Sequence, residues 1–255
     1  MSSAGVTNRN PWLLTRTINP QARLNLICFP FAGGGAQLFN RWHAAFNDVQ
    51  ICAVQYPGRG SRVRERAFTN CAALVDAFVP HLLPFLNKPF AMFGHSMGAI
   101  IAFDVARRLH HQYGLQPERL FVSGRRAPQV PSQEPPTYNL TDDEFTEELR
   151  RLNGTPPEVL EHPELMQLML EILRADFTLT ETYAYSPGPP LRCPFSVFGG
   201  LRDEEVPREH LEAWCELTSG GCSLRMFEGD HFFIQTNEAN VLRTIKEHLS
   251  LKPLS

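Results

Sequence analysis

The chain has 255 residues, of which 43% are hydrophobic and 20% are charged, as is typical of one folded domain with a sizeable core. Its formal net charge of −3 argues against a nucleic-acid-binding protein, for which a strongly basic balance is expected. No run approaches the roughly 18 apolar residues of a membrane-spanning helix, and the first residues lack the basic and apolar segments of a signal peptide.

Short apolar runs that end at turn residues predict six strands. Their ranges are 23–30, 49–58, 89–94, 119–124, 194–200 and 222–229. Apolar residues at helical spacing lie between these runs, at 74–86, 99–110 and 237–249, and Pro80 and Pro84 must bend or interrupt the first of these helices. This alternation predicts an α/β fold, a mostly parallel central sheet with helices on both faces.

The region from about 128 to 190, here called the helical insertion, breaks the alternation. It contains no convincing strand, and proline clusters mark both of its ends. The sequence TDDE at 141–144 is a capping-box pattern that precedes a helix. A longer amphipathic helix follows, with an apolar side made of Leu165, Leu168, Met169, Ile172 and Leu173. We interpret the insertion as a lid over the sheet; the alternative is that its helices pack only for stability.

The six cysteines are scattered, without a C-x-x-C pair or metal-ligand spacing. Cys28, Cys52 and Cys193 lie in or beside apolar strand-like runs, which predicts buried thiols and no metal site. This usage is typical of a reducing compartment, so we expect a cytoplasmic protein.

Ser96 lies where the segment FAMFGHSMGAIIAF, residues 90–103, changes from a strand-like run to helical spacing. Gly94 and Gly98 flank it as G-x-S-x-G, a pattern that arises by chance in roughly one chain in ten of this length. The order strand, serine, helix is more specific. In α/β hydrolases a sharp turn at this point exposes the serine hydroxyl at the carboxyl end of the sheet. Ser96 is therefore the candidate nucleophile.

A serine hydroxyl needs a base near neutral pH, and the base needs an orienting acid. In α/β hydrolases these follow the serine in the order acid, then histidine. His231 has the best position for the base, because it lies in a loop just after the strand that ends near Phe227. His95 adjoins the serine, and we expect it to shape the turn instead.

The candidate acid follows the strand predicted at 194–200. Asp203 lies a few residues beyond that strand and is our choice, with the neighbouring Glu204 as the main alternative. The loop after the preceding strand, an alternative place for the acid, offers only two arginines. Without the serine and the histidine, a solvated acidic loop would be the favoured interpretation.

The developing oxyanion needs two backbone N–H donors. Met97, directly after the candidate nucleophile, is expected to supply one, and Ala32, in the glycine-rich loop FPFAGGGA, the other. Glycines in this loop allow the backbone to approach a substrate closely. The loop lacks the Gly-Lys-Ser/Thr ending of a phosphate-binding P-loop, so that alternative is disfavoured.

Six segments occur in the order found in one enzyme family: FPFAGGGA, YPGRGSR, FGHSMGA, LRADF, GGLRDEEVP and GDHFF. With them, residues 10–249 resemble the type II thioesterases, the stand-alone editing enzymes of nonribosomal peptide and polyketide synthases. The chain shows no departure from the family at Ser96, Asp203 or His231. We therefore expect a single α/β-hydrolase domain over 1–255, with a lid at about 128–190.

The resemblance implies hydrolysis of an acyl or aminoacyl thioester held on the phosphopantetheine arm of a carrier protein, which removes stalled or misloaded groups from a synthase. Ser96 would attack the carbonyl, His231 would transfer the proton, and Asp203 would orient the imidazole. We expect acyl or peptidyl carrier protein domains as partners, no nucleic-acid or membrane partner, no cofactor beyond the phosphopantetheine of the partner, and a monomer.

Three other functions stay open. A general carboxylesterase or lipase would use the same residues on small free esters, but FPFAGGG stands where an HGGG oxyanion motif is expected. An acyltransferase or cyclase would share the chemistry up to the acyl-enzyme. A non-catalytic binding or scaffold protein is disfavoured by the complete Ser, Asp and His set.

The run GRGSRVRER, residues 58–66, places four arginines on a loop after a strand: Arg59, Arg62, Arg64 and Arg66. Carrier proteins are usually acidic, so this loop is a candidate docking surface. A solvated or internally salt-bridged loop is the favoured alternative.

Overall fold

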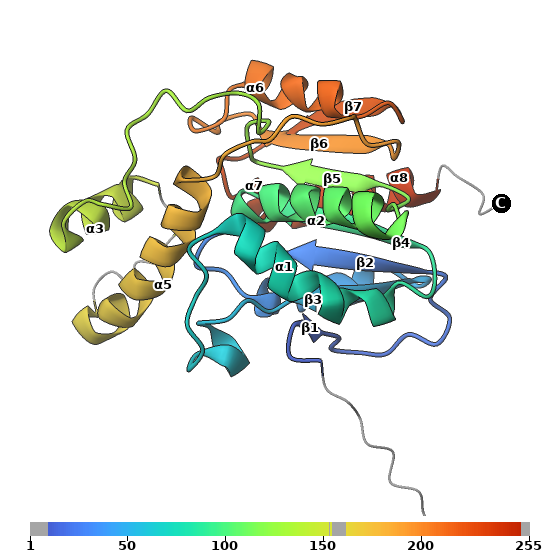
Figure 1. Ribbon diagram of the computed structural model, residues 1–255, viewed down its shortest axis with the longest axis horizontal. Helices are drawn as coiled ribbons and strands as arrows, with labels where there is room; N and C mark the ends of the chain where they lie inside the picture. Colours follow the sequence, from blue (N-terminus) through green and yellow to red (C-terminus); the bar gives the residue numbers. More distant parts are fainter. Residues whose placement is uncertain (1–9, 153, 155–161, 251–255) are drawn as a thin grey trace, which may run out of the picture.

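The computed structural model describes residues 10–152, 154 and 162–250. Among them, seven strands form one sheet in the order β1-β3-β2-β4-β5-β6-β7 (Figure 1). Their bounds are Leu13–Leu14 (β1), Leu24–Phe29 (β2), Val49–Val54 (β3), Phe90–His95 (β4), Leu120–Ser123 (β5), Phe195–Gly200 (β6) and Cys222–Phe227 (β7). The six predicted strands are confirmed, and only the short β1 was missed.

Every neighbouring pair in the sheet is parallel except β1 with β3. All six residues of β2, β4 and β6 are buried, because these strands lie between two helical layers. β7 forms an edge of the sheet, and five of its six residues are therefore exposed or half-buried. β1 is too short to show any periodicity, which explains why the sequence did not reveal it.

Helices cover both faces of the sheet (Figure 1). One face carries α1 (Cys71–Leu82), α2 (Met97–Tyr113) and α6 (Arg208–Glu212), whose apolar residues share one core. The other carries α8 (Glu238–Ser250), the short α7 (Phe233–Thr236) and the 3-10 turns η1 (Ala36–Phe39) and η2 (Trp42–Ala45), around a second core. This arrangement is that of the α/β-hydrolase fold, as expected.

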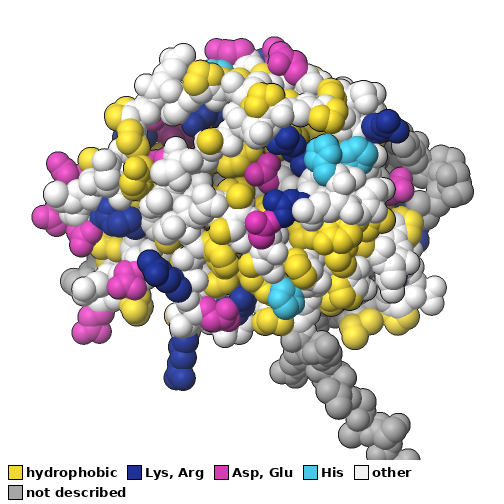
Figure 2. Space-filling model, in the orientation of Figure 1, with side chains coloured by type: hydrophobic (Ala, Val, Ile, Leu, Met, Phe, Trp, Pro, Cys, Tyr) yellow, Lys and Arg dark blue, Asp and Glu magenta, His cyan; other side chains and the backbone are white. Residues whose placement is uncertain are grey.

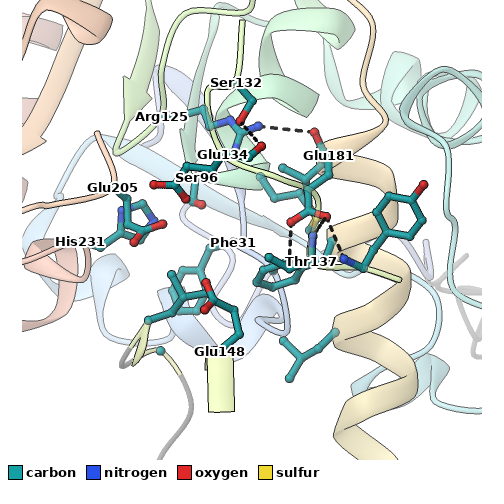
Figure 3. Close-up of a pocket in the computed structure, with 18 of the residues that line it drawn as sticks. Phe31, Ser96, Arg125, Ser132, Glu134, Thr137, Glu148, Glu181, Glu205 and His231 are labelled. Atoms are coloured by element: carbon teal, nitrogen blue, oxygen red, sulfur yellow. Dashed lines mark hydrogen bonds between the residues drawn. The ribbon is translucent and has the colours of Figure 1, made fainter. Parts of the chain in front are cut away.

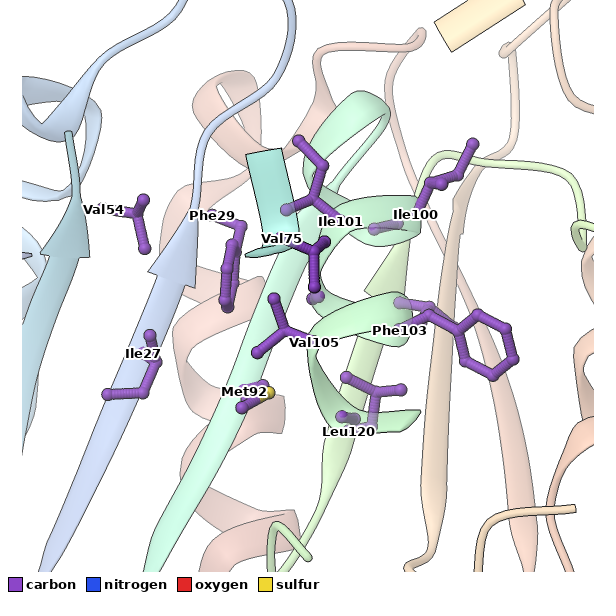
Figure 4. Packing of buried hydrophobic residues seen from close by; sticks show 14 of the residues in the cluster. Ile27, Phe29, Val54, Val75, Met92, Ile100, Ile101, Phe103, Val105 and Leu120 are labelled. Atoms are coloured by element: carbon purple, nitrogen blue, oxygen red, sulfur yellow. The ribbon is translucent and has the colours of Figure 1, made fainter. Parts of the chain in front are cut away.

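The core under α2 is continuous with the central strands (Figure 4). Val105 and Ile101 are fully buried against residues of β2 and β4 such as Ile27 and Met92. Phe103, 2% exposed, packs edge-on against Trp214 with ring centroids 5.3 Å apart. Burial of this helix ties the segment after Ser96 to the centre of the sheet.

Helix α1 differs from the prediction at both ends. It begins at Cys71 because the Asn70 side chain caps it, accepting a hydrogen bond of 2.9 Å from the N–H of Ala73. Pro80 lies inside the last turn of the helix and does not interrupt it. Pro84 lies in the 3-10 turn η4 (Leu83–Phe85) that follows, so the second proline coincides with the end of regular α-helix.

The helical insertion lies between β5 and β6, beyond the carboxyl ends of the strands (Figure 1). Its described helices are α3 (Asp142–Arg151), which begins with the predicted capping box, and α5 (Pro163–Glu181). The prediction for α5 was partly wrong: Leu165 and Leu168 are 49% and 65% exposed. The buried stripe instead runs through Met166 and Leu173, which pack against α3. Residues 153 and 155–161 of the insertion lie outside the described part of the chain.

The outer surface of α3 is strongly acidic. Its first turn carries Asp142, Asp143 and Glu144, all exposed. Figure 2 shows acidic side chains gathered at the end of the molecule that the insertion forms. Because carboxylates near a helix N-terminus are favoured by the helix dipole, these residues stabilise α3 and keep its outer face hydrated.

Cys215 and Cys222 form a disulfide between β7 and the 3-10 turn η5 (Ala213–Leu217), which no pattern in the sequence predicted. Their separation of seven residues fits no motif, and only the path of the chain into β7 brings them together. Cys28 and Cys52 are buried as predicted, and burial raises the pKa of the Cys52 thiol to about 11. Cys193 is buried as well.

Within the described part of the chain, none of the helices combines the length and the apolar character that a membrane span requires.

The packing of α2 predicts an asymmetry between two aromatic residues on the same helix. Phe103→Ala should lower the free energy of unfolding by about 3–5 kcal/mol, because it leaves a cavity against Trp214. Tyr113→Ala, at a side chain that is 44% exposed, should change it by less than about 1 kcal/mol. Urea denaturation followed by circular dichroism measures both, and equal losses would contradict this account of the core.

Candidate active site

The candidate site lies where the winding of the sheet reverses. β2 lies between β3 and β4 in the sheet. The connection that follows β2 therefore runs to a strand on one side, and the connection that follows β4 runs to a strand on the other side. The loops after two such strands diverge and leave a crevice at their carboxyl ends. Ala32 lies in the loop after β2, and Ser96 directly follows β4.

Ser96 connects β4 to α2 in a conformation that non-glycine residues rarely adopt. Its φ is 53° and its ψ is −117°, and among the described residues it is the one non-glycine with positive φ. The turn is held on both sides: the Ser96 N–H donates to the carbonyl of Ser123 at 2.8 Å, and the Ser96 carbonyl accepts from the Ala99 N–H at 3.0 Å. The side chain is thereby presented at the end of the sheet.

Both flanking glycines are required by close approach of the backbone. A Cβ at Gly94 would lie 2.1 Å from the carbonyl oxygen of Gly98. A Cβ at Gly98 would lie 2.2 Å from the carbonyl oxygen of Phe29. Since these neighbours are backbone atoms, no side-chain movement can relieve the clash. The G-x-S-x-G pattern is thus a packing requirement of the turn.

His231 and Asp203 are in contact. The Nδ1 atom of His231 lies 2.8 Å from Oδ2 of Asp203, whose side chain is fully buried. Oδ1 of Asp203 accepts a hydrogen bond of 3.0 Å from the N–H of Glu205. A carboxylate in this position makes Nδ1 the protonated nitrogen and leaves Nε2 to act as a base. The carboxylate that contacts His231 is that of Asp203, and not that of its neighbour Glu204.

The loops that carry the acid and the histidine are tied to each other. They follow the parallel neighbours β6 and β7, and the N–H of Leu201 donates to the Phe227 carbonyl at 2.8 Å. The Arg202 N–H likewise donates to the carbonyl of Gly229 at 2.9 Å. Two adjacent strand ends therefore fix the distance between Asp203 and His231.

His95 lies beneath the candidate site. It is fully buried, and its ring centroid is 5.1 Å from that of His231. Its Nδ1 is 2.9 Å from the hydroxyl of Ser123. Burial, and secondarily the neighbouring His231, lower the pKa of His95 well below its usual range, so the ring is neutral at pH 7. This position agrees with a role in shaping the turn.

The loop after β2 makes a tight turn beside Ser96. The N–H of Gly34 donates to the carbonyl of Phe31 at 3.0 Å, and Gly33 has a φ of +75°. Ala32, in this turn, and Met97, after Ser96, both line the same cavity as the serine. Their backbone N–H groups belong to the two segments from which oxyanion donors are expected.

The cavity has a volume of about 340 Å³ and contains Ser96 and His231 (Figure 3). The helical insertion supplies much of its wall, including Leu149 of α3 and Leu173 and Phe177 of α5. Phe31 and Phe232 contribute apolar surface beside the histidine. The cavity therefore combines an apolar wall with a polar end near the serine.

Charged residues that no sequence motif marked also line the cavity (Figure 3). Burial lowers the pKa of Arg125 to about 9, and its Nη2 donates to the carbonyl of Thr180 at 3.4 Å. Glu181 accepts hydrogen bonds from the N–H and the hydroxyl of Thr137 and from the N–H of Tyr138. No local motif marks these residues, because they meet only when the insertion packs over the sheet.

Two arginines of the 58–66 run are internally paired, as the favoured alternative proposed. Arg59 pairs with Asp176 at 2.6 Å, and both side chains are at most 7% exposed. Arg62 pairs with Glu65 and stacks over the ring of Trp12 at 3.9 Å. Neither is available to a partner. Of the four, only Arg64 and Arg66 are exposed.

The described residues contain no group of three or more His, Cys, Asp or Glu side chains arranged to hold a metal ion.

Known proteins are similar to the chain over most of its length. Residues 24–249 match the family model of the thioesterase domain. The chain is 40% identical to the gramicidin S biosynthesis protein GrsT of Aneurinibacillus migulanus, over 96% of each chain. The type II thioesterase BorB from the borrelidin biosynthetic cluster superposes with a TM-score of 0.86 at 38% identity, covering 93% of this chain and 97% of BorB. RedJ, a thioesterase from the prodiginine pathway in Streptomyces coelicolor, has a TM-score of 0.83 at 35% identity, covering 88% and 89%.

The lowered pKa of His95 predicts a loss of stability on mild acidification. Below the usual histidine pKa of about 6.5, the unfolded chain binds a proton at this position and the folded chain does not. The free energy of unfolding should therefore fall as the pH drops from 6.5 towards 5.5, by up to about 1.4 kcal/mol per pH unit from this group. His95→Asn should flatten the slope, whereas His111→Asn, at an exposed position on α2, should not. Urea titrations at several pH values measure this pH dependence of the free energy of unfolding. An unchanged slope in His95→Asn would refute the lowered pKa of His95 as its cause.

Proposed function

The chain belongs to the thioesterase family, and on that premise we propose that Ser96, His231 and Asp203 form the catalytic triad of a serine-hydrolase mechanism. The contact of 2.8 Å between His231 and a fully buried Asp203, at the cavity that contains Ser96, carries the proposal. Among the described residues, Asp203 forms no ion pair other than that with His231, so its carboxylate is left to serve the imidazole.

The first half-reaction forms an acyl-enzyme. Ser96 Oγ attacks the thioester carbonyl carbon while Nε2 of His231 accepts the hydroxyl proton. The carbonyl oxygen becomes an oxyanion, which the backbone N–H groups of Met97 and Ala32 stabilise. The C–S bond then breaks, and His231 returns the proton to the departing thiolate. Asp203 keeps the imidazole in the required tautomer and stabilises its protonated form.

The second half-reaction releases the acid. Water attacks the acyl-serine carbonyl while His231 accepts its proton, and a second oxyanion forms at the same donors. Collapse of this intermediate breaks the bond to Ser96 Oγ, which regains a proton from His231. The products are a carboxylic acid and a free thiol, and no cofactor of the enzyme enters either step.

We propose that the thiol is the phosphopantetheine arm of an acyl or peptidyl carrier protein, and that the enzyme removes stalled or misloaded groups from a synthase. GrsT and BorB, by their names, belong to biosynthesis of gramicidin S and borrelidin, which supports this assignment. The enzyme would act as a monomer in the cytoplasm. Residues 1–255 would form one domain, with the helical insertion as a lid whose apolar wall receives the acyl chain.

The decisive experiment loads a carrier protein with several acyl groups and follows its intact mass with and without the enzyme. We expect release of the acyl group, and a kcat/KM on the carrier-bound thioester well above that on a p-nitrophenyl ester with the same acyl group. Equal values would favour a general esterase, and a transferred or cyclised product would favour an acyltransferase. Ser96→Ala should lower the rate by at least about 10³-fold; full activity in this variant would disprove the mechanism.

The acid can be tested against its neighbour in the same loop. Asp203→Asn should lower kcat by about 10³- to 10⁴-fold, because an amide at Oδ2 favours the wrong tautomer of His231. Glu204→Gln, a matched change one residue away, should leave kcat within about twofold. Both are measured by release of free thiol from an acyl thioester. The reverse pattern would assign the acid to Glu204.

A further inference from the structure

Asp176 lies in the interior of α5, yet its side chain is only 3% exposed. Its carboxylate accepts three hydrogen bonds from two other parts of the chain. Arg59 donates through both terminal nitrogens, Nη1 to Oδ2 at 2.6 Å and Nη2 to Oδ1 at 2.7 Å. The third donor is the backbone N–H of Gly33, 2.7 Å from Oδ2. A buried carboxylate is stable only with such partners, so this site links α5 to two loops at once.

The N–H that Asp176 binds belongs to the central peptide of the turn beside Ser96. The bond from Gly34 N–H to the Phe31 carbonyl closes a β-turn over 31–34. Gly33 has a φ of +75°, whereas Ala32 has no positive φ, so the turn is of type II. Types I and II differ by a flip of the peptide between the two central residues, here Ala32 and Gly33. The direction of the Gly33 N–H therefore shows the orientation of that peptide, and the hydrogen bond of this N–H to Asp176 favours that orientation.

The same turn is also held in place by contacts with Arg59 and with α5. Arg59 Nη1 donates to the carbonyl of Gly34 at 3.2 Å, in addition to its bond with Asp176. A Cβ at Gly33 would lie 2.7 Å from Cδ2 of Leu173, so α5 lies directly against the loop backbone. Gln55 extends the network: it accepts from the Ala36 N–H at 3.2 Å and donates to the Arg59 carbonyl at 2.9 Å.

We propose that Asp176 is a positioning residue for the oxyanion hole. Its carboxylate holds the Ala32–Gly33 peptide in the type II orientation and thereby orients Ala32, from which the second oxyanion donor comes. The same carboxylate anchors α5, and with it part of the cavity wall, to this loop. This inference rests on the proposed function, because it requires that the turn over 31–34 contributes to the hole.

The test compares Asp176→Asn with Asp142→Asn. In either orientation of its amide, an asparagine at 176 places an NH₂ group against Arg59 or Gly33 N–H, where the structure needs an acceptor. Asp142→Asn removes another ion pair of α5, that with Arg174 at 2.6 Å, without touching the turn. The readouts are kcat and KM for an acyl thioester and the affinities of two ligands with the same alkyl chain. A trifluoromethyl ketone forms an oxyanion on Ser96, and the product carboxylic acid does not.

We expect Asp176→Asn to lower kcat and the trifluoromethyl ketone affinity by about 10- to 100-fold, as for misplacement of one oxyanion donor. The affinity of the product acid should change by less than about threefold, and Asp142→Asn should match the wild type throughout. Unchanged kcat and ketone affinity in Asp176→Asn would overturn the proposal. So would an equal loss of both ligands, which would indicate a role in the cavity wall alone. A wild-type chain inactive on thioesters would overturn the proposed function itself.

A measurement on the wild-type protein keeps the proposal testable if Asp176→Asn fails to fold. In protein labelled with ¹⁵N-glycine, the amide proton of Gly33 should be shifted downfield by its bond to a carboxylate and should exchange slowly with solvent, although Gly33 is only half-buried. Exchange as fast as that of the amide of Gly188, an exposed glycine, would overturn the proposal. Arg59→Lys, which retains a cation, should preserve the slow exchange.

Discussion

The sharp turn at Ser96 is the constraint on which the rest of the site depends. A non-glycine residue at a φ of 53° and a ψ of −117° carries backbone strain on the order of 1–3 kcal/mol. The conformation persists because a wholly buried strand precedes it and a deeply buried helix follows it. At positions 94 and 98 the surrounding backbone leaves room for glycine but not for a Cβ atom. The core of the fold therefore holds Ser96, the proposed nucleophile, in a conformation that no local interaction would stabilise.

The other parts of the site follow from the order of the strands. Parallel strands place all of their carboxyl ends at one edge of the sheet, and the reversal of winding between β2 and β4 opens the crevice there. The loop after β2 then lies beside Ser96, and the ends of β6 and β7 bring Asp203 to His231. Ser96 lies more than 100 positions before Asp203 and His231 along the chain, yet each of the three lies within a few residues of a strand end.

The helical insertion forms part of the cavity wall and is itself bound to the loops that carry Gly33 and Arg59. Leu173 packs on Gly33, and Asp176 binds both Gly33 and Arg59, so one helix contacts the turn that faces the serine. Arg59 is thereby removed from the surface, where its place in an arginine-rich run had made it a candidate for docking. The wall of the cavity and the geometry of the loop after β2 consequently depend on the same buried ion pair.

By itself, the sequence determined the six longer strands, the α/β class, and Ser96, Asp203 and His231 as the candidate triad. These features are recorded locally, in hydrophobic periodicity, in glycines flanking a turn, and in polar residues that follow strand ends. Asp203 was preferred with Glu204 as the main alternative, because chain order and a position just after the strand fit both neighbours. The contact with His231 in the structure distinguishes them.

Only the tertiary structure decided which side of α5 is buried, what Arg59 and Asp176 bind, how Cys215 meets Cys222, and which charged residues line the cavity. Leu165 and Leu168 have the same apolar character as Leu173, and periodicity alone cannot tell which of them will be buried against α3 and the loop after β2. A buried ion pair likewise leaves no local pattern, since its partners lie 117 residues apart. The physical reason is common to all four: each depends on how the insertion and the loops pack on the sheet, and that packing is a property of the assembled chain.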